Sequence, residues 1–185
     1  MQHIKNQQAH AGKPVNWQPD HLEDHLVRLV PLEPGHFEQM YQVASDPIMW
    51  EQHPAKDRYK KEVFQQFFND AIDSGTAFLI IDKATQTVIG STRFYDYKPE
   101  ESSIAIGFTF LSRSFWGGTW NRSIKTLMLD YAFQFVDQVF FHIGINNKRS
   151  QIATTRIGAR LVREMDLSSD GRAIPHYEYV IRRES

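Results

Sequence analysis

The chain has 185 residues, in which 21 lysine and arginine side chains nearly balance 22 aspartate and glutamate side chains, and it contains no cysteine. This length suffices for one domain with its own core, whereas the balanced charge argues against a nucleic-acid or anionic-membrane partner. Without cysteine the chain can have no disulfide framework, thiol nucleophile or cysteine zinc site, which agrees with a reducing, cytoplasmic location.

The N-terminal stretch, residues 1–24, is polar and contains prolines and a glycine, so we expect an irregular arm in which only Trp17 docks. The remaining residues, 25–185, are predicted to form a single domain. Neither part contains an apolar run long enough for a signal peptide or a membrane span. The protein is therefore expected to be soluble and not exported.

The first half of the domain is predicted to run strand, helix, helix and then three antiparallel strands. "HLVRLVPLEP" is a short strand stopped by proline, and apolar residues at helical spacing follow from Pro34 to about Ala44. A second helix from Tyr59 to Ile72 ends at Gly75, after the loop "SDPIMWEQHPAKD". The three strands are "TAFLIID", "TVIGSTRFYDY" and "SSIAIGFTFL". The last of them alternates four apolar residues with small ones: Ile104, Ile106, Phe108 and Phe110.

The second half is predicted to begin with a long helix from about Thr119 to Asp137. Its buried face is expected to consist of Ile124, Leu127, Met128, Tyr131, Ala132 and Phe135. The strand "VFFHIGI" follows, and then a short helix in "NNKRSQIATTRIGA" that stops at Gly158. Two last strands are expected near Arg160 to Asp166 and His176 to Arg182.

The loop "SRSFWGGTWN", which leads into the long helix, is a candidate anion site. A helix N-terminus presents unpaired N–H groups and the positive end of the helix dipole. The loop matches neither the nucleoside triphosphate pattern G-x-x-x-x-G-K-[ST] nor the dinucleotide pattern G-x-G-x-x-G. Taken alone, Gly117 and Gly118 could equally make only a tight turn.

Two separated segments carry a resemblance to a known family. "IGFTFLSRSFWGG" is similar to the strand and coenzyme loop, and "NKRSQIATTRIGA" to the N-x-x-S segment, of the Rim-type (ribosomal-protein alanine acetyltransferase-like) branch of the GNAT superfamily of N-acetyltransferases. The resemblance runs from about Leu26 to Arg182. It implies an α/β fold of the α+β type, in which a mixed, mostly antiparallel sheet of about seven strands is flanked by about four helices. The resemblance further implies that this sheet splays after the fourth strand to admit acetyl-CoA.

The resemblance also implies how the co-substrate acetyl-CoA would be held. Backbone amides of Phe110 and Leu111 would bind the pantetheine arm, and amides of the following loop would bind the pyrophosphate. The residues implied in coenzyme binding are Phe110, Leu111, Arg113, Trp116, Gly117, Gly118, Thr119, Trp120, Asn121 and Asn147.

The loop departs from the usual family pattern at two positions. Ser114 takes the place of a basic residue, with Arg113 one position earlier, and Thr119 replaces the second small residue. The Cβ of Thr119 narrows the room beside a phosphate, although its hydroxyl could donate one hydrogen bond in return.

The implied chemistry is direct attack of an amine on the thioester, without an acyl-enzyme. Ser150 would return a proton to the thiolate, with water as the alternative acid, and Asn147 would position it. The two residues could instead be only the first turn and N-cap of a helix. The tyrosine that many GNAT branches place four residues further on is replaced by Thr154.

Candidates for the proton acceptor, or for recognition of the amine, are Glu51, His53, Glu101 and His142, because carboxylates and imidazoles suit both tasks. Glu51 is preferred because it lies in the loop between the first two helices, which lines the acceptor cleft in the family. Trp50 beside it could form the floor of that cleft, or could equally be a core residue. The eight histidines show no metal-site spacing, so no metal is predicted.

The predicted function is acetyl transfer to a primary amine, either a protein N-terminal α-amine or a small amine such as a polyamine, an amino acid or an aminoglycoside. The alternative is a non-catalytic acyl-CoA-binding or assembly module with the same fold. No nucleic-acid or membrane partner is expected, and the aromatic-rich strands and terminal hairpin could pair two copies in a homodimer.

Overall fold

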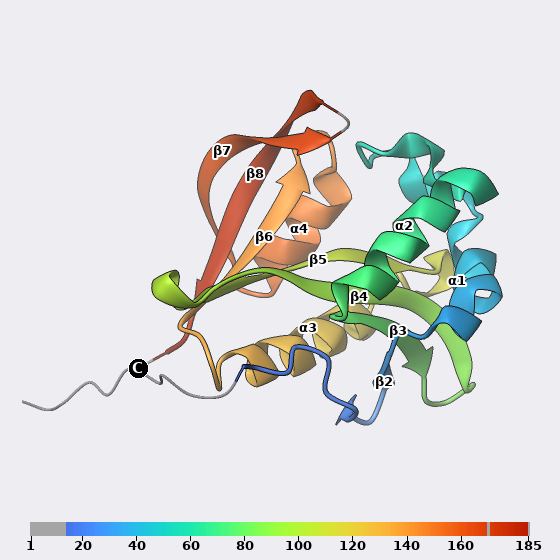
Figure 1. Cartoon of the computed structure of the whole chain (residues 1–185), viewed down its shortest axis with the longest axis horizontal. Helices are drawn as coiled ribbons and strands as arrows, with labels where there is room; N and C mark the ends of the chain where they lie inside the picture. Colours follow the sequence, from blue (N-terminus) through green and yellow to red (C-terminus); the bar gives the residue numbers. More distant parts are fainter. Residues whose placement is uncertain (1–13, 170, 185) are drawn as a thin grey trace, which may run out of the picture.

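A computed structural model describes residues 14–169 and 171–184, and over these residues the chain forms one eight-stranded sheet and four α-helices (Figure 1). The strand order is β1-β2-β3-β4-β5-β6-β8-β7. Every neighbouring pair is antiparallel except β5 and β6, which run parallel. The predicted mixed, mostly antiparallel α/β class is thus confirmed. None of the helices in the described part of the chain is long and apolar enough to cross a membrane.

The N-terminal half follows the predicted order of strand, helix, helix and three strands. Its elements are β1 (Leu22–Glu23), β2 (Val27–Pro31), α1 (Phe37–Ala44), α2 (Lys61–Ser74), β3 (Ala77–Asp82), β4 (Thr87–Lys98) and β5 (Ser103–Leu111). Gly75 ends α2 with a φ of 61°, in the left-handed region that glycine adopts without strain. Short 3-10 helices η2 (Pro47–Trp50) and η3 (Lys56–Tyr59) fill the loop between α1 and α2.

Part of the predicted N-terminal arm, residues 1–13, lies outside the described residues. In the described part, Trp17 is buried as expected, but Leu22 is buried too. The two-residue strand β1 also pairs with β2, which the sequence did not predict. Because of β1, the strand predicted to be the fourth is the fifth in the sheet.

The C-terminal half consists of α3 (Thr119–Ala132), β6 (Gln138–Gly144), α4 (Lys148–Arg156), β7 (Arg160–Ser169) and β8 (Arg172–Arg182). The prediction that the long helix reaches Asp137 was wrong. The N–H groups of Phe135 and Val136 both bond to the carbonyl of Ala132, which closes a turn instead of continuing the helix. Phe135 is accordingly 42% exposed instead of buried.

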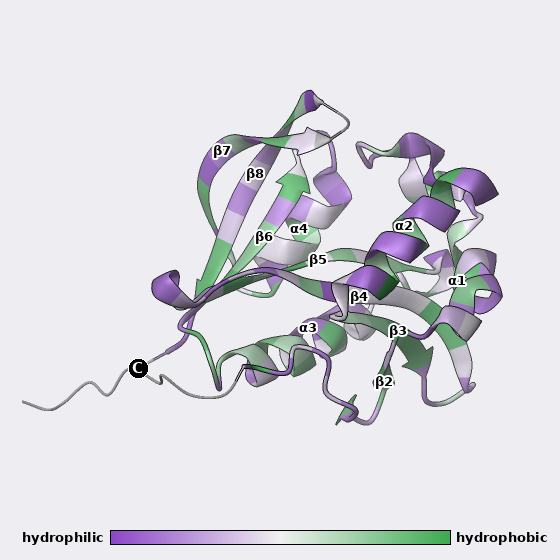
Figure 2. Ribbon diagram, in the orientation of Figure 1, coloured by the Kyte–Doolittle hydropathy of each residue, from purple (hydrophilic) through white to green (hydrophobic). Residues whose placement is uncertain are grey.

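Two hydrophobic cores form on the sheet, and each has its own helices. The first contains Ile124, Met128 and Ala132 of α3 packed with Phe94 and Ile104 of the strands. The second gathers the apolar faces of α1 and α2 on the other face of the sheet. Figure 2 shows the outer surfaces of α1 and α2 as mostly hydrophilic, which fits helices that bury a single face.

The apolar alternation predicted for β5 fails at Phe108, which is 40% exposed. Between Gly107 and Phe110, β5 has one residue more than the facing stretch of β4, and Phe108 has a φ of 52°. This is a β-bulge, which bends the strand that carries it. Beyond the bulge β5 has left β6, because these strands pair only at Ser103–Ala105. The expected splay of the sheet is therefore present.

Candidate active site

Three cavities lie next to one another where β5 and β6 diverge, and they share lining residues; together they are called the passage. The loop cavity is lined by Gly117, Gly118, Thr119, Asn121, Arg122, Ala153, Arg156 and Ile157. The central cavity lies between Trp50, His53, Thr109, Lys125, Asn147 and Ser150, among others. The far cavity opens beside the β7–β8 hairpin and is lined by Arg58, Tyr95, Phe108, His142, Arg172 and His176, among others. Asn121 and Ala153 border the loop and central cavities, whereas His53 and Arg58 border the central and far cavities.

Most of the residues predicted from the sequence line this passage. They are Phe110, Leu111, Trp116, Gly117, Gly118, Thr119, Asn121, Asn147 and Ser150. They come from the end of β5, the start of α3 and the start of α4, so the splay of the sheet is what brings them together. Trp50 also lines the central cavity, and at 3% exposed it is part of the second hydrophobic core as well.

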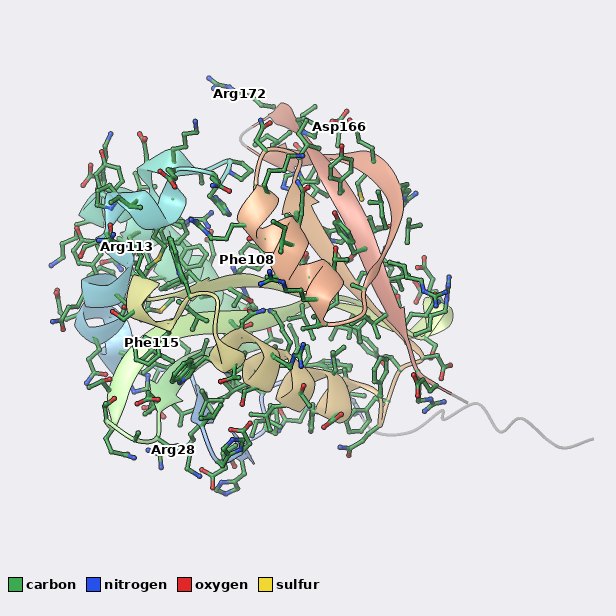
Figure 3. All side chains as sticks on the ribbon, turned by 180° about the vertical axis from the view of Figure 1, so that it is seen from behind. Arg28, Phe108, Arg113, Phe115, Asp166 and Arg172 are labelled. Carbon is green, nitrogen blue, oxygen red and sulfur yellow. The ribbon has the colours of Figure 1, made fainter. Side chains whose placement is uncertain are left out.

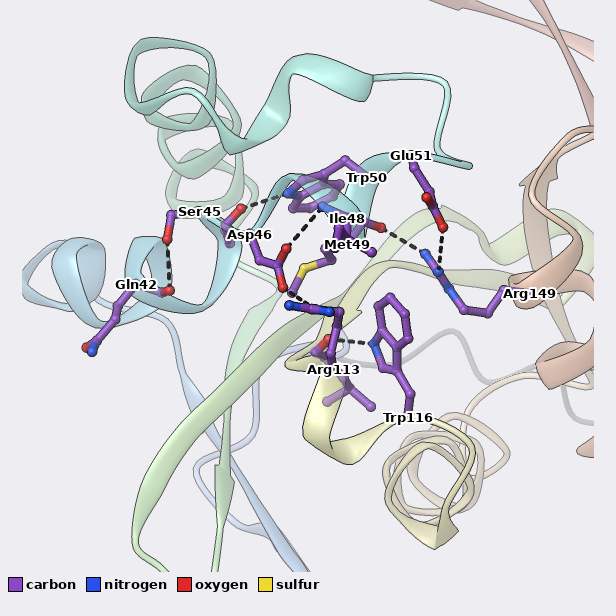
Figure 4. A network of polar contacts seen from close by, with 12 residues as sticks. Gln42, Ser45, Asp46, Ile48, Met49, Trp50, Glu51, Arg113, Trp116 and Arg149 are labelled. Carbon is purple, nitrogen blue, oxygen red and sulfur yellow. Dashed lines mark hydrogen bonds and ion pairs between the residues drawn. The ribbon is translucent and has the colours of Figure 1, made fainter.

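Three other predicted residues direct their side chains elsewhere. The guanidinium of Arg113 pairs with the carboxylate of Asp46, outside the passage (Figure 4). The indole N–H of Trp120 donates to Asp82 over 3.0 Å. The carboxylate of Glu51, which is 55% exposed, lies 3.9 Å from the guanidinium of Arg149 at the rim.

The mouth of the central cavity is bridged by Arg149 and Trp116 (Figure 4). The Arg149 guanidinium stacks 3.8 Å from the Trp116 ring centre and donates to the carbonyl of Met49 over 2.8 Å. The Trp116 indole N–H in turn donates to the carbonyl of Leu111 over 2.8 Å. These contacts tie α4, η2 and the loop after β5 into one rim.

The start of α4 is capped from within the site. The side-chain oxygen of Asn147 accepts the backbone N–H of Ser150 over 3.2 Å, and Asn147 is buried. Asn147 is therefore an N-cap, which is one of the two interpretations of the motif. Within the described residues, the Ser150 hydroxyl forms no hydrogen bond, so it is available to a group in the central cavity.

The loop cavity has the features of an anion site. Gly117 has a φ of 67°, and Gly118 is the N-cap of α3, whose first turn contains no acidic residue. Residues of this helix start line the cavity, and so do Arg122 and Arg156. Unpaired backbone donors and two cations suit a diphosphate.

Lys125 is a residue of the central cavity that the sequence interpretation missed. Its ammonium is buried, donates to the Thr109 hydroxyl over 2.6 Å and lies 5.8 Å from the ring centre of Phe141. Burial lowers the pKa of Lys125 to about 7, because the charged form loses its hydration. The sequence did contain an indication that Lys125 is buried, because this residue lies one turn before Met128 and Leu129 on the apolar side of the helix.

Replacing Lys125 by methionine is expected to stabilise the protein near pH 7. The lysine has its ordinary pKa in the unfolded chain and a pKa of about 7 when folded, so unfolding takes up a proton between these values. Wild-type stability therefore rises as the pH increases from about 7 towards 10. The variant should gain on the order of 5 °C in Tm at pH 7, and this gain should shrink at pH 10. Thermal unfolding at both values checks this, and an equal loss of stability at both would contradict it.

His142 lies between the central and far cavities in a chain of hydrogen bonds. Its Nε2 is 3.1 Å from a carboxylate oxygen of Glu178, and its Nδ1 is 2.7 Å from the Tyr95 hydroxyl. Burial opposes ionisation of Glu178, but hydrogen bonds from Arg163 and His142 outweigh it and lower its pKa. The carboxylate can therefore only accept, so Nε2 donates and Nδ1 accepts from Tyr95.

The other two base candidates fit less well. Burial and the charges of Arg58 and His176 lower the pKa of His53 to about 3, which makes it a poor proton acceptor. Glu101 lies in the turn between β4 and β5 and does not line the passage. Among the described residues no three His, Asp or Glu side chains gather in an arrangement suited to a metal ion.

Comparisons with known proteins agree with the GNAT resemblance of the sequence. The family model "Acetyltransferase (GNAT) domain" matches residues 27–160. A GCN5-related N-acetyltransferase from Brucella melitensis superposes with a TM-score of 0.79 at 19% identity, over 92% of this chain and 80% of that one. The acetyltransferase MccE of microcin C7 self-immunity, solved with acetyl-CoA and AMP, gives 0.72 at 15% identity, over 92% and 100%. Spermidine N-acetyltransferase from Vibrio cholerae, solved with CoA and spermine, gives 0.65 at 15% identity, over 84% and 95%.

No curated protein sequence matches the chain. At these low identities, the likeness to the solved structures shows the fold.

Proposed function

This chain belongs to the GNAT acetyltransferase family, and on that premise we propose that it transfers the acetyl group of acetyl-CoA to a primary amine. The observation that carries the proposal is the passage through the splayed sheet, which has one opening at the start of α3 and another beside the β7–β8 hairpin. Separate cavities are therefore available for a coenzyme and an amine. The two molecules would meet in the central cavity, beside Ser150.

The loop cavity supports the donor half of this proposal. Its helix N-terminus and the cations Arg122 and Arg156 would hold the pyrophosphate of acetyl-CoA. The pantetheine arm would then follow the edge of β5 at Phe110 and Leu111 into the central cavity. When bound there, acetyl-CoA supplies an activated acyl group, and the protein has to orient it and move protons.

Three parts of the site are suited to moving those protons: the chain of Tyr95, His142 and Glu178, the hydroxyl of Ser150, and Lys125. Tyr95 lines the far cavity, where its phenol oxygen would accept a proton from the entering amine while its own proton passes to Nδ1 of His142, a residue that borders both the far and the central cavity. The carboxylate of Glu178 would stabilise the resulting imidazolium. The Ser150 hydroxyl would return a proton to the departing thiolate, and Lys125, with a pKa of about 7, can exchange a proton with the same cavity.

Replacing Ser150 by alanine should lower kcat for thiol release about 100-fold and leave acetyl-CoA binding nearly unchanged. The reason is that the hydroxyl acts only as the thiolate forms. The measurement is release of free CoA thiol from acetyl-CoA, in the presence of a panel of primary amines. Thr155→Ala is the matched control, because Thr155 is an exposed hydroxyl on the same helix whose partner is the carbonyl of Gln151. Equal rates in wild type and Ser150→Ala would remove Ser150 from the mechanism.

The same assay separates the enzyme from a non-catalytic acyl-CoA-binding module. Binding of acetyl-CoA without thiol release on any amine would favour the module. The similarity of "IGFTFLSRSFWGG" to Rim-type enzymes is the reason for including peptides with free N-termini among the amines. A cytoplasmic location and a homodimeric state remain predictions from the sequence.

A further inference from the structure

Arg58 is a cation of the passage that has aromatic neighbours and no ion-pair partner among the described residues. It borders both the central and the far cavity. Its guanidinium lies 4.3 Å from the ring centre of Phe67 and 5.1 Å from that of Trp50. Such stacking covers the flat face of a guanidinium and leaves its N–H edge free to bind.

The neighbours of Arg58 do not satisfy its donors. The nearest nitrogen, Nε2 of His53, lies 3.4 Å from the guanidinium. Because Nδ1 of His53 accepts the backbone N–H of Ala55 over 2.9 Å, the proton of the neutral ring sits on Nε2, which then cannot accept from Arg58. Burial and the charge of Arg93 lower the pKa of Arg58 to about 10, and the carboxylate of Asp70 offsets this only in part.

The rest of the far cavity adds to this positive character. Arg172, the first residue of β8, stands at the tip of the β7–β8 hairpin (Figure 3) and lines the same cavity. No aspartate or glutamate of the described residues lines it. The carboxylate of Glu178, behind His142, is already engaged by Arg163 over 2.9 Å. An incoming polyamine would therefore meet cations and no free carboxylate, which disfavours it.

The fold alone leaves the charge of the acceptor open. One structural neighbour was solved with AMP, an anion, and another with spermine, a polycation. The charges that line the far cavity of this chain decide between the two. We propose that Arg58 binds an anionic group of the acceptor, a carboxylate or a phosphate, so that the favoured substrates are primary amines that also carry an anion. This inference rests on the proposed acetyl transfer.

The test compares amines that differ only in the anion. Thiol release from acetyl-CoA is followed with ω-amino acids from glycine to ε-aminocaproate, with alkylamines of matching length, and with diamines. Phosphoethanolamine paired with ethanolamine distinguishes a phosphate from a carboxylate requirement. Wild type should show a kcat/KM at least about 30-fold higher for the anionic member of the best pair. This comparison needs no variant, so it does not depend on the folding of a mutant.

Variants then assign the preference to Arg58. Arg58→Gln should bring the ratio of kcat/KM values within each pair close to one. Arg58→Lys should retain part of the preference for the anionic amine, because lysine keeps the charge but not the planar donor edge. Lys56→Gln is the matched control, since it removes an exposed cation from the same short helix, η3, outside the passage. Equal ratios in wild type and Arg58→Gln would overturn the proposal.

Further outcomes separate this proposal from the proposed function. Faster turnover of diamines or plain alkylamines than of ω-amino acids would overturn the anion site and leave acetyl transfer standing. If no amine supports turnover, calorimetric titration of γ-aminobutyrate and phosphoethanolamine into CoA-saturated protein decides whether the anion site exists. Binding to wild type but not to Arg58→Gln would support the anion site while the proposed function fails. Absence of binding to either protein would overturn the site.

Discussion

Replacing Ala153 by tryptophan should abolish the stabilisation of the protein by acetyl-CoA while leaving the fold intact. Ala153 is the small residue of α4 that borders both the loop and the central cavity, and it is only partly buried. An indole at this position would fill the path of the pantetheine arm. A ligand at about 100 times its Kd stabilises the folded state by about 2.7 kcal/mol, so its loss is readily seen. The measurement is the rise in Tm that saturating acetyl-CoA produces.

Ile152→Trp is the matched control for this prediction. Ile152 is the preceding residue of α4, is 53% exposed and does not line the passage. The control should therefore keep the acetyl-CoA-dependent rise in Tm, and both variants should unfold within a few degrees of wild type without ligand. An undiminished rise in Ala153→Trp would mean that acetyl-CoA does not pass through this cleft.

Replacing Gly90 by alanine should destabilise the protein strongly. Gly90 lies in β4 opposite Leu111, and a Cβ on it would stand 1.9 Å from the carbonyl oxygen of Phe110. That oxygen is backbone, so two paired strands would have to move apart to admit a methyl group. We expect a loss of about 3 kcal/mol or more, together with weaker coenzyme binding, because Phe110 and Leu111 border the central cavity.

Gly35→Ala serves as the control, because a Cβ added at Gly35 would meet no other group within 4 Å and the φ of this residue is not in the left-handed region. Urea unfolding of wild type and the two variants measures the difference. A Gly90→Ala protein as stable as Gly35→Ala would show that β4 and β5 do not pair as closely as described.

Much of the fold follows from local patterns that the sequence carries. The apolar period of α2 and the glycine cap at Gly75 place that helix, and Gly158, with a φ of 95°, directly follows the C-cap Ile157 of α4. What the sequence could not provide is structure set by neighbouring strands. The bulge at Phe108 depends on the register between β4 and β5, and an alternating strand pattern continues through it unchanged.

The site shows the same division between local and tertiary information. Asn147 and Ser150 were predicted from the resemblance of "NKRSQIATTRIGA" to the family's N-x-x-S segment, and the structure shows that Asn147 caps α4. Arg58 and Lys125 were missed because their chemistry comes from burial against other elements: Phe67 of α2 stacks on Arg58, and Phe141 of β6 lies beside Lys125. Arg113 was assigned to coenzyme binding by its place in the loop, whereas the structure pairs it with Asp46.

The most direct test of the proposed function is a calorimetric titration of the wild-type protein with acetyl-CoA. A passage with a diphosphate site at the start of α3 predicts saturable binding of one molecule per chain, with a Kd below about 100 μM. Competition by CoA, which shares the pyrophosphate and the pantetheine arm, should abolish the heat. No saturable heat up to millimolar acetyl-CoA would contradict the assignment of this cleft to the coenzyme.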